Sequence, residues 1–318
     1  MNDLWTSRYF DCEQDLLQMQ NLLMVARSQT DDWRYAHIGE LLFTFFMVAC
    51  HLDPKEHIRL WHAGDKLAGY AILSEDPAFD WQVLPEYEWR GIEEEALTWA
   101  ETCLDELCER DAQRWGHPIV SGARQDNARR IAFMEQHGFC QGGEFSEVNL
   151  ILSLDSPIPE PDAPPGYHVR VVNEAGEFSK RADAHREVWL PWTVGNVSDE
   201  DYIKFTQLPG YDRQLDLVAV APDGVIAAFV NGWIDPVNCI GDFGPVGARL
   251  AYRRKGLTRT VLLEGLQRMK ARGMRRVCVS TGISNTPAIQ LYQSVGFRVV
   301  NSYLEFLQRG KKHGNPLP

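Results

Sequence analysis

Two segments in opposite halves of the 318-residue chain repeat each other. The first is Asp126–Phe139 (DNARRIAFMEQHGF) and the second is Ser284–Phe297 (SNTPAIQLYQSVGF). Three residue types recur at one spacing of 158 positions, as the pairs Asn127/Asn285, Gly138/Gly296 and Phe139/Phe297. In each copy the Asn can cap a short helix, the Gly can close it in the left-handed conformation, and the Phe can open the next strand. A repeat of this length indicates tandem domains rather than solenoid units.

A proline-rich segment separates the two copies. Residues Asp155–Gly166 (DSPIPEPDAPPG) hold five prolines in twelve positions, which excludes a helix or a central strand. We therefore expect an N-terminal domain over residues 1–154, an extended linker over 155–166 and a C-terminal domain over 167–318. The chain is long enough for two domains of ordinary size.

The composition provides enough hydrophobic residues for a buried core and an excess of negative charge. Hydrophobic residues make up 44% of the chain and the net charge is −12, so we expect neither nucleic acid nor an anionic membrane as a partner. The longest apolar run, Leu41–Cys50, is too short to span a bilayer. The seven cysteines and nine histidines show no metal-ligand spacing, which predicts reduced thiols and no metal. We expect a cytoplasmic monomer or homodimer.

The apolar pattern predicts strands and helices in a mixed order. In the second half a strand is followed by two helices, three strands, a long amphipathic helix and a further strand. The expected ranges are 168–172, 177–189, a helix starting at 198, 215–221, 225–233, 240–248, 257–272 and 276–281. The first half follows a similar order. The predicted fold class is α/β, with a mixed and mainly antiparallel sheet flanked by helices in each domain.

The strongest chemical signal is a basic loop between the third of these strands and the long helix. Residues Arg249–Arg259 (RLAYRRKGLTR) carry five basic side chains in eleven positions. A helix N-terminus presents free N–H groups and a positive dipole end, and Gly256 lets an anion approach the backbone closely. On a chain of charge −12, this loop predicts a local anion site.

Two motifs in this half resemble those of a known family. The pattern Arg253-x-x-Gly256-x-Thr258 resembles the acetyl-CoA signature of the GCN5-related N-acetyltransferase (GNAT) family, with Thr in the last small position. The downstream segment NTPAIQLYQSVGF resembles the family's Asn-x-x-Ala-x-x-Leu-Tyr-x-x-x-Gly-Phe segment. The whole chain is similar to tandem two-GNAT proteins such as the mycothiol synthase-like proteins.

The resemblance implies a role for particular residues. Main-chain groups near Val246 and Ala248 would pair with the pantetheine arm, and Asn285 would steady the cofactor. Tyr292 would be the general acid that protonates the departing thiolate. The alternatives are that Asn285 only caps its helix and that Tyr292 is a half-buried helix residue. The pyrophosphate of acetyl-CoA would lie on the loop residues Arg253, Arg254, Lys255, Gly256, Leu257, Thr258 and Arg259.

The general base is less clear from the sequence. In relatives of this two-domain type a Glu is expected directly before Pro-Val-Gly, where this chain has Gly244. Asp242 lies two residues earlier on the same expected strand, and alternation places it on the same face, so it is the replacement candidate. Asp235 is a weaker candidate. An amine that arrives neutral needs mostly positioning and no base.

The corresponding loop of the first half has lost its positive charge. Residues Pro85–Ala96 keep a Gly before a helix but contain five glutamates and one arginine. Carboxylates would repel a pyrophosphate, whereas they stabilise a helix N-terminus that binds no anion. Met134 stands where the second half has Tyr292. We therefore expect a degenerate GNAT domain that shapes the substrate cleft or stabilises its neighbour.

These observations predict an N-acetyltransferase. It would move acetyl from acetyl-CoA, bound in the C-terminal domain, to a primary amine of a small molecule by direct attack. Two alternatives stay open from the sequence. One is a non-catalytic acyl-CoA-binding or regulatory protein, favoured by Gly244 and Thr258. The other is an acyltransferase with another acyl donor or acceptor.

Overall fold

Both copies of the repeat form the expected capped helix. In the computed structural model, which describes residues 4–30, 34–142, 146–173, 176–190 and 192–308, α6 spans Ala128–Gln136 and α10 spans Thr286–Val295. Asn127 and Asn285 accept hydrogen bonds at the two N-termini. Gly138 and Gly296 have φ angles of 84° and 113°, which only glycine adopts readily. The predicted helix ends are confirmed.

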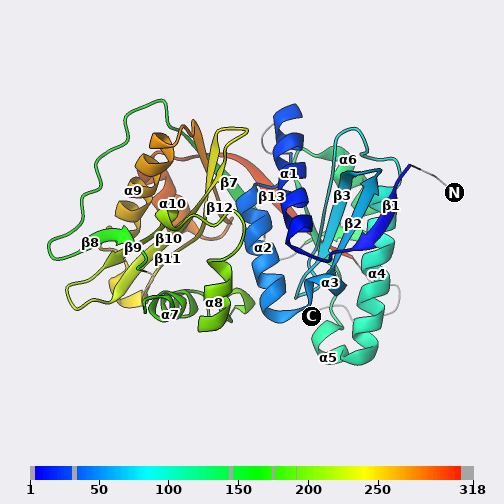
Figure 1. The fold of residues 1–318 in the computed structure, drawn as a ribbon, viewed down its shortest axis with the longest axis horizontal. Helices are drawn as coiled ribbons and strands as arrows, with labels where there is room; N and C mark the ends of the chain where they lie inside the picture. The colour runs from blue at the N-terminus through cyan, green and yellow to red at the C-terminus, as the bar shows by residue number, and fades with distance from the viewer. Residues whose placement is uncertain (1–3, 31–33, 143–145, 174–175, 191, 309–318) are drawn as a thin grey trace. The chain divides into compact units, whose positions relative to one another are not determined.

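Contacts between residues divide the chain into two units. Figure 1 shows the whole chain, coloured by residue number. Unit 1 comprises Met1–Ala36, Met47–Glu147 and Asn301–Pro318, and unit 2 comprises His37–Phe46 and Val148–Val300. The repeat predicts a division at residues 155–166, whereas the units exchange short pieces of chain across that point. Described separately, each unit has its own sheet and core.

Unit 1 is built on the antiparallel sheet β1-β2-β3-β4. The end of the C-terminal strand β13 pairs with β5 and β6 in the same unit, where Phe306 joins a core that contains Phe139 and Met134. Its elements are β1 (Thr6–Tyr9), α1 (Glu13–Gln29), the end of α2 (Ile38–His51), α3 (Pro54–His57), β2 (Ile58–Ala63), β3 (Lys66–Leu73), β4 (Phe79–Val83), α4 (Ile92–Arg110), α5 (Ala112–Trp115), β5 (Val120–Arg124), α6, β6 (Phe139–Gln141) and β13 (Arg298–Gln308).

Unit 2 contains the sheet order β7-β12-β11-β10-β9-β8. Helices α9 and α10 cover one face of this sheet and α7 and α8 lie on the other (Figure 1). Strands β11 and β12 are parallel, whereas β8 to β11 pair antiparallel. The elements are β7 (Glu147–Ser153), β8 (His168–Val171), α7 (Phe178–Trp189), α8 (Asp199–Phe205), β9 (Asp216–Val220), β10 (Ile226–Asp235), β11 (Ile240–Ala248), α9 (Leu257–Ala271), β12 (Arg276–Gly282) and α10, with 3-10 turns η1 (Thr193–Gly195), η2 (Arg213–Leu215) and η3 (Leu250–Tyr252).

The proline-rich segment has no helix or strand, as its composition predicts. It runs along α9: Thr260 Oγ1 donates to the carbonyl of Asp162 at 3.0 Å, and Lys270 Nζ donates to that of Ser156 at 2.9 Å. Strand β7, which precedes it, packs Leu150 into the same unit 2 core as Val279. Among the described residues, no helix is both long and apolar enough to cross a bilayer.

Candidate functional site

The basic loop leads directly into α9 and leaves the helix N-terminus uncapped. Gly256 is the N-cap residue with φ 78°, and no side chain accepts from the first turn. Arg254 also has a positive φ, 62°. Arg253 Nε donates to the carbonyl of Ala248 at 3.1 Å and anchors the loop to the end of β11. The N–H groups of the first turn of α9 therefore have no side-chain acceptor among the described residues, and the loop before them is exposed.

Four of the five basic residues remain available for an anion. Arg249 differs from the rest, because its guanidinium pairs with both Asp183 and Glu187. Lys255 places its ammonium 4.9 Å from the ring centre of Tyr252. The remaining cations share one property, which is that none has a carboxylate partner among the described residues: Arg253, Arg254, Lys255 and Arg259. No carboxylate in the described ranges neutralises their charge, so it can act on a phosphate.

Strand β11 separates from β12 beside this loop. Within residues 192–308 the parallel pairing covers Ile240–Asp242 with Arg276–Cys278 and does not continue. Beyond that point β11 still pairs with β10, up to Ala248 opposite Ala228. One edge of the segment from Phe243 to Ala248 therefore has no strand beside it in register, which leaves room for an extended ligand to pair with main-chain groups.

The structure places Asn285 and Tyr292 on α10 in different environments. Asn285 is exposed; its side chain accepts from Ala288 N–H at 3.3 Å and donates to Thr281 Oγ1 at 3.1 Å. It therefore works as a helix cap in this structure. Tyr292 is more buried than its half-buried alternative predicts, with 5% of its surface exposed, and its ring lies 6.0 Å from that of Phe297.

Because the strand register shifts next to Asp242, simple alternation along β11 does not predict which of its side chains share a face. Between Gly232↔Phe243 and Val230↔Val246 the register shifts, so β11 carries one extra residue at this bulge. Asp242 is 5% exposed, and its Oδ2 lies 3.9 Å from His37 Nδ1. Gly244 has open space at its Cα and accepts from Trp233 Nε1 through its carbonyl at 2.6 Å.

Asp235 has a structural task at the turn between β10 and β11. Its Oδ1 accepts from the N–H groups of Val237 and Asn238, both at 3.0 Å. Its Oδ2 accepts from Asn238 Nδ2 at 2.6 Å. The carboxylate is therefore engaged in holding the turn, and the structure favours Asp242 over Asp235 as the carboxylate to test.

The corresponding loop of unit 1 keeps the backbone conformation of the basic loop. One of its own side chains occupies the site that this conformation forms. Trp89 and Gly91 have φ angles of 60° and 119°, two residues apart like Arg254 and Gly256. Glu93 Oε1 accepts from the N–H of Trp89 at 2.7 Å, and Glu93 is 1% exposed. An internal carboxylate thus takes the position where an external anion would bind.

Three of the other glutamates in this loop bond within unit 1. Glu86 pairs with Lys66, Glu88 with Arg34, and Glu95 accepts from two tryptophan side chains. Met134 is fully buried in the same unit. These contacts account for the acidic residues structurally and agree with the expectation that this loop is degenerate.

Glu93→Gln is expected to stabilise unit 1 increasingly as pH rises. Burial is the main cause that raises the pKa of Glu93, so the folded state binds a proton more tightly than the unfolded state. Wild-type stability contributed by Glu93 therefore falls as pH rises above the unfolded pKa, and Gln lacks this loss. Calorimetric melting temperatures at pH 4 and pH 7 measure it: the variant minus wild-type difference should be more positive at pH 7. A difference that shrinks or reverses with rising pH contradicts the account.

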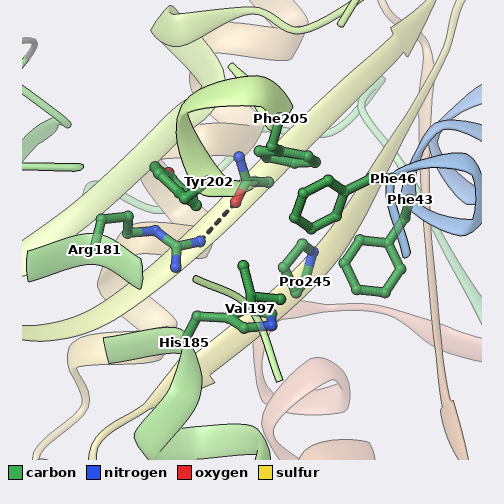
Figure 2. A pocket seen from close by; sticks show the side chains of 9 residues that line it. Phe43, Phe46, Arg181, His185, Val197, Tyr202, Phe205 and Pro245 are labelled. Atoms are coloured by element: carbon green, nitrogen blue, oxygen red, sulfur yellow. Dashed lines mark hydrogen bonds between the residues drawn. The ribbon is translucent and has the colours of Figure 1, made fainter. Parts of the chain in front are cut away.

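The sequence gives no signal for a second polar site, on the opposite face of the unit 2 sheet from α9. Arg181, on α7, is completely buried and lines a small cavity with His185 and Asn231 (Figure 2). From the sequence, an arginine within an amphipathic helix is expected on the surface, and Asn231 on β10 belongs to no recognisable motif. Long-range packing alone brings them together.

The unit 2 fold, the uncapped basic helix N-terminus and the separated strands define a class of acyl-transferring proteins. Residues 182–297 match the model of the acetyltransferase (GNAT) family. This part of the chain is a GNAT-family domain, and the chain as a whole has the fold of tandem GNAT acyltransferases.

Similar proteins agree with this class. The chain is 27% identical over 253 residues to the mycothiol acetyltransferase of Thermobispora bispora, covering 75% of this chain and 79% of that protein. A GCN5-related N-acetyltransferase from Sphaerobacter thermophilus has the same fold, with a TM-score of 0.62, 22% identity and 96% coverage of both chains. A tandem GNAT protein from the clavulanic acid biosynthesis pathway also has a TM-score of 0.62, with 12% identity and coverage of 95% and 98%.

Proposed function

We propose that this chain transfers an acetyl group from acetyl-CoA to a primary amine of a small molecule by direct attack. The observation that carries the proposal is the uncapped N-terminus of α9, with four cations that have no carboxylate partner in the described part of the chain, next to the free edge of β11. This arrangement fits a ligand with a pyrophosphate at one end and an extended amide-containing arm at the other. The relative named mycothiol acetyltransferase supports acetyl transfer to a small molecule.

In this proposal the cofactor lies along unit 2. The N–H groups from Arg254 to Arg259 hold the pyrophosphate, with the side chains of Arg253 and Lys255 adding charge. Main-chain groups of Val246 and Ala248 pair with the pantetheine amides. The thioester then lies where β11 and β12 separate, near Asp242 and Cys278, the last residues in register.

The chemistry needs one C–N bond made, one C–S bond broken and a net movement of one proton from nitrogen to sulfur, in two transfers after which Asp242 gives its proton to solvent and Tyr292 takes one from it. The neutral amine nitrogen attacks the thioester carbonyl carbon, forming a C–N bond, and the tetrahedral intermediate collapses with loss of the C–S bond. The nitrogen loses a proton, for which Asp242 is the proposed acceptor, directly or through water. The departing thiolate gains a proton from Tyr292. Gly244 supplies no carboxylate, so positioning carries more of the rate than base strength.

A binding and turnover experiment tests the function. Titration calorimetry with acetyl-CoA should show one binding site, and thiol release should accompany acetylation of at least some members of a primary-amine panel. Absence of acetyl-CoA binding contradicts the cofactor assignment. Binding with no thiol release for any amine or alcohol acceptor indicates a non-catalytic acyl-CoA-binding protein instead.

Arg254→Gly is expected to weaken acetyl-CoA binding without lowering stability. Glycine suits the φ of 62° at this position better than arginine does, so the melting temperature should stay level or rise. Loss of one exposed cation near the phosphates should raise Kd by about three- to ten-fold at low salt, and less at high salt. Calorimetric titrations at two ionic strengths measure both effects. An unchanged Kd at low salt removes Arg254 from the site.

A further inference from the structure

The indole of Trp233 on β10 makes a hydrogen bond where the neighbouring strand β11 is irregular. Its Nε1 donates to the carbonyl of Gly244 at 2.6 Å, and the side chain is almost fully buried. The register shift places Gly244 and Pro245 of β11 opposite a single residue of β10, Asn231. Proline has no N–H to give to a strand ladder. The indole bond therefore ties β10 to a bulge at which the ladder is interrupted.

This bulge changes the face of the sheet to which the side chains of β11 point. Before it, Gly241 faces α9, where an added Cβ would meet the sulfur of a methionine of that helix. After it, Gly247 faces α7, where an added Cβ would meet Val188 at 2.9 Å. Val246 accordingly packs on the core beside α9, whereas unbroken alternation would put it on the face of Asp242. The bulge therefore fixes the orientation of the groups at Val246 relative to Asp242.

The ring of Trp233 is held on two further sides. It meets the ring of Phe205 on α8 edge to face, with ring centres 5.5 Å apart and planes at 86°. On another side lies Gly39, in the first turn of α2, where an added Cβ would meet Trp233 Cδ1 at 2.5 Å and Asp242 Oδ2 at 2.9 Å. Only a residue without a side chain fits there while the indole and the carboxylate keep their places.

The first part of α2 is itself anchored within unit 2. The ring of His37 bridges two elements: its Nδ1 accepts from the N–H of Gly39 at 3.0 Å, and its Nε2 lies 3.3 Å from the carbonyl of Ile240, the first residue of β11. Further along α2, Phe46 packs against Phe205, with ring centres 4.7 Å apart (Figure 2). These contacts hold Gly39 against β11 and give the indole a fixed surface to rest on.

We propose that Trp233 is a positioning residue for acetyl transfer, and that Gly39 keeps its indole in place. By holding the carbonyl of Gly244, the indole sets the bulge that orients Asp242 and the main-chain groups of Val246 at the free edge of β11. Both residues act through β11 rather than by contact with the reacting atoms. This inference deepens the proposed function and rests on it for the reaction that is positioned.

Trp233→Phe in the full chain removes the indole N–H and keeps an aromatic ring. We expect kcat for thiol release to fall by about ten- to a hundred-fold, because a small misplacement of reacting groups has effects of this size. The Kd for acetyl-CoA should rise by less than about three-fold, since the pyrophosphate end of the proposed site, at Gly256, is unchanged. Rapid kinetics and titration calorimetry measure the two quantities separately.

Trp61→Phe is the matched control for losing a buried indole. Trp61 belongs to unit 1, is as buried as Trp233, and donates from Nε1 to Glu95 at 2.8 Å. The control should lower the melting temperature as Trp233→Phe does and keep kcat within about two-fold of wild type. If kcat of Trp233→Phe equals that of the control, the proposal is overturned.

Gly39→Ala tests the same role from another element. It leaves the indole N–H in place and pushes on the ring with its new Cβ, and alanine suits a helix better than glycine does. The same fall in kcat at nearly constant Kd is expected. Wild-type kcat in Gly39→Ala shows that α2 does not hold the indole and overturns that part of the proposal.

Hydrogen–deuterium exchange without ligand separates this inference from the proposed function. In the unliganded full chain, the amides between Phe243 and Ala248 should exchange about ten-fold faster in Trp233→Phe than in wild type or Trp61→Phe, because a buried hydrogen bond is lost. If Trp233→Phe does not fold, Gly39→Ala decides by the same measurement. Unchanged exchange overturns the inference even in an active enzyme. Faster exchange in a protein that binds no acetyl-CoA supports the role of the indole and contradicts the proposed function.

Discussion

Gly256→Glu is expected to abolish acetyl-CoA binding while the protein stays folded. The new carboxylate would stand at the N-terminus of α9, in the space where the pyrophosphate is proposed to bind. Two like charges about 4 Å apart repel by about 4 kcal/mol at an effective dielectric constant of 20, so a loss of at least a hundred-fold in affinity is expected. Unit 1 has an analogous arrangement, with Glu93 bonded to the N–H of Trp89 in a loop of the same φ pattern.

Gly273→Glu is the matched control for backbone strain. Gly273 follows the C-terminal end of the same helix, with φ 84° against 78° for Gly256, and an added Cβ has open space at both positions. Both substitutions place a side chain at a positive φ and should lower the melting temperature, Gly273→Glu more so because a carboxylate is unfavourable at a helix C-terminus. Only Gly256→Glu should remove the calorimetric signal for acetyl-CoA. Equal affinities for the two variants would show that the N-terminus of α9 is not the anion site.

Tyr292→Phe is expected to lower kcat by about a hundred-fold and to leave the Kd for acetyl-CoA unchanged. Loss of a positioned general acid costs roughly 10²- to 10⁴-fold in rate, and the lower end applies because a thiolate is a fair leaving group without a proton. The ring remains, so its packing against Phe297 is kept. Stopped-flow or steady-state measurement of thiol release at saturating acetyl-CoA gives the rate, and calorimetry gives the affinity.

Tyr303→Phe serves as the control for losing a tyrosine hydroxyl. This residue belongs to unit 1, where its hydroxyl donates to the carbonyl of Gly122 at 2.9 Å. The control should lower stability by about 1 kcal/mol and keep the turnover rate. If Tyr292→Phe turns over as fast as this control, Tyr292 is a core residue only, and the thiolate leaves without a protein acid.

The sequence could predict those features of the protein that depend on residues close together in the chain. The caps Asn127 and Asn285, the glycines that end both helices and the loop around Gly256 depend on residues within a few positions of one another. Their hydrogen bonds and φ angles follow from residue type and order. The internal carboxylate in the corresponding loop of the first half follows similarly, because Glu93 reaches back to Trp89 only four residues away.

Contacts between distant residues could not be read in this way. The pairing of Arg249 with Asp183 and Glu187 removes one of five apparent anion-binding cations, and the residues lie more than sixty positions apart. The separation of β11 from β12 and the bulge beside Asn231 depend on how neighbouring strands pair.

Residue order accounts for the tandem repeat and for the uncapped helix N-terminus behind a basic loop, because those features are built from short-range geometry. The three-dimensional packing accounts for the exchange of β7 and the end of β13 between the units and for the buried guanidinium of Arg181. Burial in a shared core sets the energy of a side chain, and that core is assembled from segments whose positions along the chain do not reveal that they meet.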